Sequence, residues 1–242
     1  MIYMLLISHL LGDYVFQFDR LARWKFRSIW GVVAHGGIVT ATTVACAALV
    51  EATWWPFALL IGLSHTLIDV VRARLIPAKQ PVRAWLSLVA DQVSHVAIIV
   101  GVALATDAPS LPAPPPSLRG GMDVRVWLYL IGYLVLLQPA WVLVRFTARG
   151  MWGEEVPPLG RGEKYAPMVE RVLIATAVWL GQFYLVPLVL LPRRLALLQT
   201  QRNGMVVLVQ LTTHWGETCL GVGLALLIGL GLRLLSLGVV WM

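Results

Sequence analysis

The sequence predicts an all-α, polytopic integral membrane protein with about seven transmembrane helices, and three observations lead to this fold class. Of the 242 residues, 59% are hydrophobic and only 13% are charged. The mean hydropathy is +0.78. A soluble domain of this composition would lack the polar groups to cover its surface. At about 20 residues a span, the chain has room for six or seven helices and for no sizeable soluble domain.

Apolar segments mark the expected spans in chain order. They lie near residues 1–18, 29–50, 54–75, 84–105, 124–147, 170–191 and 205–235. The first four are expected to form a polar-cored bundle over residues 1–105, and the last three occupy residues 124–242. Residues 106–123 are rich in proline, which cannot continue a helix, so an extended exterior linker is expected there.

The distribution of basic residues predicts the topology. Two clusters flank the second and third spans, and the positive-inside rule makes both cytoplasmic and the N-terminus exterior: Arg20, Arg23, Lys25 and Arg27, then Arg72, Arg74, Lys79 and Arg83. The net charge of +7 therefore predicts anchoring at a membrane surface and no nucleic-acid binding, because the basic residues form no continuous stripe. Arg193 and Arg194 would lie outside, against the rule, and Pro187 and Pro192 disfavour a regular helix. Residues 170–204 are therefore expected to be partly interfacial or re-entrant.

Three pairs of histidine and aspartate lie four residues apart within the apolar segments. They are His9 with Asp13, His65 with Asp69, and Asp91 with His95. An ionisable side chain in a membrane span is costly unless it pairs, binds a metal or lines a polar path. The third pair has the reverse order. If the helix that carries it runs antiparallel to the helices of the other two pairs, the three histidines lie in one layer and the three aspartates in another. His35, on the second span, falls at a matching depth at 1.5 Å per residue.

These residue types predict a metal site. Imidazole and carboxylate groups one helical turn apart bind zinc, manganese or iron, and seven candidate groups suffice for one or two ions. The expected ligands are His9, Asp13, His35, His65, Asp69, Asp91 and His95, with Asp13 and Asp91 as candidates for catalytic acid–base chemistry. Two alternatives stay open. The groups pack by local pairing, as Asp69 would with Arg72, or they form a proton or ion relay.

The motifs around these residues resemble a family. Ser8-His9-Leu10-Leu11-Gly12-Asp13, Ala34-His35-Gly36, Ser64-His65-Thr66-Leu67-Ile68-Asp69 and Asp91-Gln92-Val93-Ser94-His95 are similar to the serial motifs of an uncharacterised bacterial inner-membrane family, domain of unknown function 3307. The resemblance covers about residues 5–100 well. It implies a location in the bacterial inner membrane, with the N-terminus periplasmic, and it names no reaction.

A looser similarity suggests a reaction class. The segment Ser64-His65-Thr66-Leu67-Ile68-Asp69 is also similar to motifs of membrane-bound metal-dependent hydrolases. The sequence thus predicts a hydrolase whose partners are membrane lipids and an amphipathic substrate: a lipid phosphoester, a polyprenyl phosphate or a membrane-anchored peptide. The alternatives are an ion- or proton-coupled transporter that uses the same groups, and a nonenzymatic protein with a structural metal. The oligomeric state does not follow from the sequence.

Overall fold

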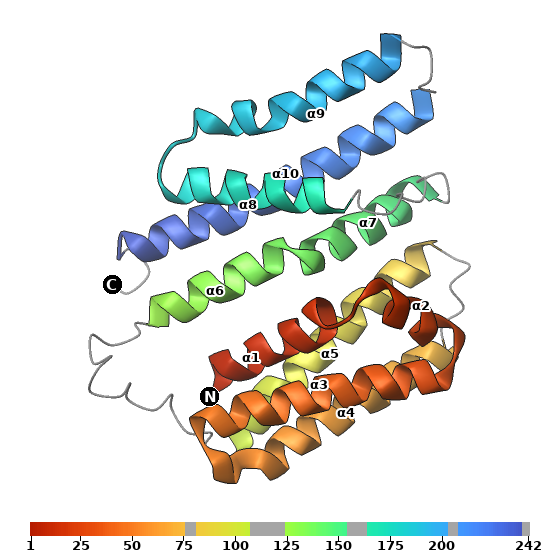
Figure 1. Ribbon diagram of the computed structural model, residues 1–242, viewed down its shortest axis with the longest axis vertical. Coiled ribbons are helices and arrows are strands. Elements are labelled where there is room, and N and C mark those ends of the chain that lie inside the picture. Colours follow the sequence, from red (N-terminus) through yellow and green to blue (C-terminus); the bar gives the residue numbers. More distant parts are fainter. Residues whose placement is uncertain (76–80, 107–123, 154–163, 203–207, 239–242) are drawn as a thin grey trace. The chain divides into compact units, whose positions relative to one another are not determined.

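The computed structural model is helical throughout its regular elements (Figure 1). It describes residues 1–75, 81–106, 124–153, 164–202 and 208–238. The chain divides into two compact units, Met1–Ile131 and Gly132–Met242, and each is described by itself. Most of the Pro-rich segment expected as a linker, residues 107–123, lies outside the described residues.

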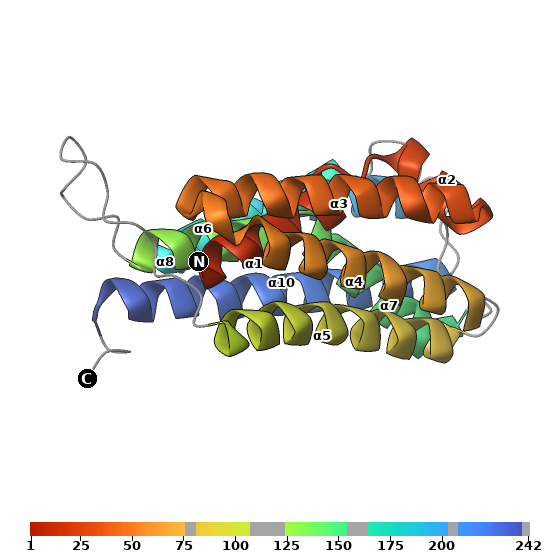
Figure 2. The ribbon, with the colours of Figure 1, turned by 90° about the horizontal axis from the view of Figure 1, so that it is seen from below.

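Four helices of the first unit pack against one another. Its elements are α1 (Ile2–Leu10), η1 (Leu11–Val15), α2 (Asp19–Arg27), α3 (Ile29–Val50), η2 (Ala52–Trp54), α4 (Trp55–Leu75) and α5 (Pro81–Ala105), followed by most of α6 (Val124–Leu136). Helices α1 and α4 each contact both α3 and α5. Helices α4 and α5 run side by side in opposite directions (Figure 2). The antiparallel arrangement that the reversed Asp91–His95 order requires is therefore present.

The beginning of the chain differs from the expected span over residues 1–18. Helix α1 ends at Leu10 and passes into a π-helical turn over Leu11–Val15, which gives an apolar helix too short to count among the candidate spans. The expected loop at residues 19–27 is in fact helix α2. Extended backbone at Phe18 and Ser28 separates α2 from its neighbours, and the Ser28 hydroxyl accepts a hydrogen bond from the Trp30 backbone N–H at 3.2 Å.

An apolar core fills the end of the first unit that is remote from α2. It joins the start of α1 to the end of α3, the start of α4 and the end of α5, through Met1, Leu5, Ala47, Trp54, Ala58, Ile61, Ile99 and Ala103. Each of these side chains is at most 6% exposed. The polar residues of the same four helices therefore lie nearer the other end, where α2 and the last turn of α4 are found.

The second unit contains the end of α6, α7 (Gln138–Trp152), α8 (Tyr165–Trp179), α9 (Leu185–Arg202) and α10 (Leu208–Ser236). Helices α6 and α7 meet at a bend of 44°. The span expected near residues 170–191 is wrong, because α8 ends at Trp179 and α9 begins only at Leu185. The break falls at Gly181, whose φ of 77° is strained for other residues, whereas Pro187 and Pro192 both lie within α9.

Four of the described helices are long and apolar enough to cross a membrane. They are Ile29–Val50, Ala52–Arg74, Pro81–Ala105 and Trp215–Ser236, and the bent pair α6–α7 makes a fifth if it forms one span. One face of α4 exposes Leu60, Leu63, Leu67 and Val71, each more than 40% accessible. Such an apolar stripe fits a lipid environment and would be unfavourable in water. The chain is thus a membrane protein whose described residues contain four to five candidate spans, and the seven expected spans are not confirmed.

Candidate metal centre

All seven residues that the sequence singles out as ligands lie in one cluster inside the first unit. Each is at most 5% exposed, and His35 is fully buried. They come from five elements: His9 from α1, Asp13 from η1, His35 from α3, His65 and Asp69 from α4, and Asp91 and His95 from α5. Contacts of 4.0 Å or less between side-chain atoms, together with the packing of the His9 ring on those of His65 and His95, connect them without a gap.

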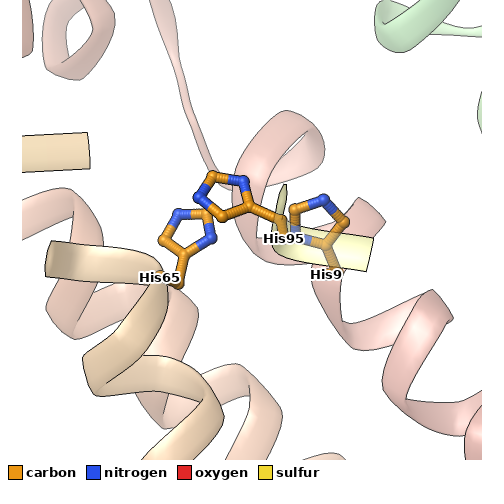
Figure 3. Close-up of side chains that lie close together, drawn as sticks. All are labelled: His9, His65 and His95. Carbon is orange, nitrogen blue, oxygen red and sulfur yellow. The ribbon is translucent and has the colours of Figure 1, made fainter. Parts of the chain in front are cut away.

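Three histidines from three different helices meet at the centre of this cluster (Figure 3). The rings of His65 and His95 stack with their centroids 3.9 Å apart. The ring of His9 stands edge-on to both, at 5.6 Å from His65 and 5.4 Å from His95. One nitrogen from each ring lies within 4.8 Å of the other two. This group can offer three neutral nitrogen ligands to one ion.

The three aspartates each contact a basic group or a histidine. Asp13 Oδ1 lies 2.9 Å from His35 Nε2, and Asp69 Oδ2 lies 2.8 Å from the Lys25 ammonium of α2. Asp91 Oδ2 accepts a hydrogen bond from Arg72 at 2.9 Å. The expected alternative of an Asp69–Arg72 pair is therefore wrong, because the Arg72 side chain crosses from α4 to α5. Each of the three carboxylates therefore has a polar or cationic partner.

Gln92 links the aspartates to the histidines. Its amide nitrogen donates to Asp13 Oδ2 at 3.0 Å and to Asp91 Oδ2 at 3.1 Å, and its oxygen lies 3.4 Å from His9 Nε2. A neutral amide that both donates and accepts can hold a carboxylate and an imidazole in fixed positions at the same time. Gln92 therefore orients this side of the cluster without adding charge.

The π-helical turn determines where Asp13 points. The expectation that His9 and Asp13 share one face of a regular α-helix is wrong, because Leu11–Val15 has the wider turn in which the Phe16 N–H donates to the Leu11 carbonyl at 2.8 Å. Asp13 instead contacts His35 on α3. Gly12 allows this close approach, since a Cβ there would lie 3.0 Å from the Cα of Val39.

Close packing of α3 on α4 brings His35 and His65 together. Gly36 on α3 faces Thr66 on α4, and Gly62 on α4 faces Thr40 on α3. A Cβ at Gly62 would lie 2.6 Å from the Cα of Thr40, so a larger residue cannot fit without separating the helices. Small residues at helix contacts let backbones approach in this way in membranes. The Nε2 atoms of His35 and His65 consequently lie 3.5 Å apart.

Several buried polar atoms of the cluster lack a hydrogen-bond partner within the described part of the chain. Both ring nitrogens of His95, Nδ1 of His35 and Oδ1 of Asp91 are in this state. A neutral imidazole has one N–H donor and one acceptor nitrogen. Each buried group left unsatisfied costs roughly 1–3 kcal/mol. A cation near His95 would relieve that cost, so the residues present fit a metal.

The cluster contains three overlapping groups of candidate ligands. The groups differ in the hydrogen bonds and ion pairs that their ligand atoms already make. Both oxygens of Asp13 accept hydrogen bonds, and Asp69 and Asp91 each contact a cationic side chain. Among these three groups, that of His9, His65 and His95 contains no carboxylate and therefore no anion that a cationic side chain already neutralises. A small cavity adjoins these three rings, with Thr43, Ile61, Ile98 and Ile99 forming its other walls. The cavity thus adjoins all three imidazoles, although His9 Nε2 also lies 3.4 Å from the Gln92 oxygen and His65 Nε2 lies 3.4 Å from Asp69 Oδ2.

The sequence motifs and a comparison with family models agree on the first half of the chain. Residues 1–112 match the DUF3307 family model. The description of this family is a protein of unknown function. The match confirms the resemblance predicted from the His/Asp motifs. All seven cluster residues lie inside the DUF3307 match. Neither the curated proteins nor the solved structures contained a match to the chain. The similarity to metal-dependent hydrolases stays a prediction.

Proposed function

We propose that the protein is a membrane-embedded metal-dependent hydrolase acting on an amphipathic substrate. The observation that carries this proposal is the convergence of His9, His65 and His95, with both ring nitrogens of His95 buried and without a hydrogen-bond partner in the described chain. In this proposal α1, α3, α4 and α5 form a bundle whose polar core is the reaction centre.

His9, His65 and His95 would hold one divalent transition metal, with zinc favoured and manganese or iron as alternatives. Zinc–nitrogen bonds of about 2.0–2.1 Å place ligand nitrogens on one ion ~3.4 Å apart. The three rings, whose nitrogens lie within 4.8 Å, would draw together by about 1 Å. The metal would supply Lewis acidity, polarising a phosphoryl or acyl oxygen and promoting the ionisation of water.

The charges of the cluster favour one ion over two. With all groups ionised, three aspartates face Lys25 and Arg72, which leaves a formal charge of minus one. One divalent ion changes this to plus one, and a second would raise it to plus three. Excess charge in a low-dielectric interior is strongly unfavourable. The cationic partners Lys25 and Arg72 therefore make a second divalent ion unfavourable.

The two aspartates proposed for catalysis receive different roles. Asp91 Oδ1 has no hydrogen-bond partner among the described residues and lies 4.0 Å from His95 Nε2, so it is placed to accept a proton beside the imidazoles. Asp13 uses both oxygens to hold His35 and Gln92. Asp91 is therefore the proposed general base, and Asp13 is a positioning residue.

The location of the cluster supports an amphipathic substrate. It lies toward the end of the first unit that carries α2 and Arg72, and the positive-inside rule makes that basic end cytoplasmic. We propose a bacterial inner-membrane protein with an exterior N-terminus, a site in the cytoplasmic half of the bilayer, and membrane lipids as its surroundings. A lipid phosphoester, a polyprenyl phosphate or a membrane-anchored peptide could present its polar group at that depth.

Metal analysis of the full chain purified in mild detergent tests the proposal. Wild type should retain about one equivalent of a transition metal, and His95→Ala should retain less than a tenth of that. Ser94→Ala is the matched control, because the Ser94 hydroxyl bonds only to the Ala90 carbonyl of its own helix. The proposal fails if wild type, reloaded with zinc and passed over a desalting column, retains no more metal than His95→Ala.

A transporter that uses the same groups is the second candidate, and the continuous chain of polar contacts from Asp91 through Gln92 to Asp13 and His35 favours it. Assays in detergent separate the two, since no gradient exists there. Turnover of a lipid phosphoester or peptide in micelles supports the hydrolase. Ion flux that requires sealed vesicles and is lost in Asp91→Asn, without any turnover in micelles, supports the transporter.

A further inference from the structure

A second polar site lies within the second unit. Three arginines and two glutamates from α7, α8, α9 and α10 line one pocket: Arg145, Glu170, Arg171, Arg193 and Glu217. Trp141, Val144, Ile174 and Val222 contribute apolar walls to the same pocket. We propose that this pocket binds a phosphate group.

Two of the arginines are already matched by carboxylates. Arg145 donates to Glu217 at 2.6 Å, and Arg193 donates to Glu170 at 2.9 Å. The first pair is the more enclosed, with side chains 10% and 12% exposed. Glu217 is thus held by an arginine.

Arg171 is the third arginine, and no carboxylate of the described chain lies within ion-pair distance of it. Arg171 is only 4% exposed. Its guanidinium donates to two backbone carbonyls, of Leu136 at 3.0 Å and of Leu137 at 3.3 Å. These carbonyls lie at the C-terminal end of α6, whose dipole offsets roughly half a unit charge. The remainder of the charge is buried without a carboxylate partner among the residues that the structure describes.

A bound anion resolves this imbalance. Of the five charged residues that line the pocket within the described ranges, three are positive and two negative, so the described lining carries one excess positive charge. A buried charge is stable only when it is paired. Guanidinium groups present several N–H donors in one plane and bind phosphate oxygens through two of them at once. The apolar walls would accommodate the body that carries the phosphate, such as the glycerol and first methylenes of a phospholipid.

Ligand-induced stabilisation of the full chain measures this binding. The probes are phosphatidylglycerol added to neutral detergent micelles, phosphatidylcholine added in the same way, and inorganic phosphate. A ligand that binds the folded state raises the unfolding temperature with its concentration. Stabilisation by the anionic lipid alone identifies a lipid phosphate, and stabilisation by inorganic phosphate identifies a soluble source. If none of the three probes stabilises the wild-type chain, the proposal is wrong.

Two substitutions test the pocket itself in opposite directions. Arg171→Gln should lower the affinity of the stabilising probe at least tenfold, whereas Arg149→Gln, which removes an exposed charge one turn after Arg145, should change it less than twofold. Glu217→Gln should raise the affinity severalfold, because it removes one negative charge from the pocket. A gain cannot arise from misfolding, so it keeps the test informative if Arg171→Gln does not fold. Equal affinities in wild type, Arg171→Gln and Glu217→Gln would overturn the proposal.

Discussion

The contact between α3 and α4 makes a quantitative prediction for Gly62→Ala. The added Cβ would lie 2.6 Å from Thr40 Cα and 2.5 Å from Thr40 Oγ1. Carbon atoms in ordinary contact are about 3.5–4.0 Å apart, so the helices must separate locally by about 1 Å. Overpacking of this kind costs about 1–3 kcal/mol. Gly37→Ala is the matched control, because a Cβ at Gly37 meets no atom within 4 Å.

Reversible unfolding of the full chain, by titration of sodium dodecyl sulfate into mild detergent micelles, gives the two free energies of unfolding. Gly37→Ala should be equal to wild type or more stable by up to about 1 kcal/mol, the usual gain for alanine over glycine in a helix. Gly62→Ala should be less stable than Gly37→Ala by about 1–3 kcal/mol, because the propensity gain is common to both variants and the overpacking cost is not. It should also weaken zinc binding about tenfold, because His65 lies one turn from Gly62. If Gly62→Ala and Gly37→Ala are equally stable, the close packing inferred here is wrong.

Two further substitutions test single contacts. Lys25→Gln should tighten divalent-metal binding in a competition titration with a coloured chelator, because Asp69 loses its cationic partner. Arg23→Gln, at an exposed position of the same helix, should leave that affinity unchanged. Gly181→Ala should lower the free energy of unfolding by about 1–2 kcal/mol, because φ there is 77°. Gly231→Ala, where a Cβ meets nothing within 4 Å, should not lower it in the same detergent titration.

The sequence located the long spans well because their signal is local. Residues 29–50 were expected as a span and form α3 with the same bounds, and the two spans that follow begin or end within three residues of the expected positions. Each is a continuous apolar run with polar residues at its ends, and such a run is sufficient to predict a membrane helix. The motifs also selected the seven buried residues, since ionisable groups are rare in such runs.

The parts that the sequence could not predict depend on contacts between segments. The basic stretch around Lys25 reads as a loop because it lacks an apolar run, yet it forms α2 and returns Lys25 to Asp69. Arg72 is nearest to Asp69 along the chain but reaches Asp91 across the helix interface. The break at Gly181 had one available signal, a glycine within an apolar run, and the nearby prolines obscured it. Partner choice and helix ends of this kind depend on tertiary packing.

The apolar core of the first unit distinguishes between the two candidate functions. A carrier must open its site to each side of the membrane in turn, so polar groups or water must reach the site from both ends of the bundle. On the side remote from α2, the cavity at the histidines is bounded by Ile61 and Ile99, which also belong to the core that includes Leu5, Trp54 and Ala103. A route through it would require the packed ends of four helices to separate. A hydrolase needs access from one side only, so a closed core at the remote end is compatible with the proposed hydrolase and disfavours the alternative carrier.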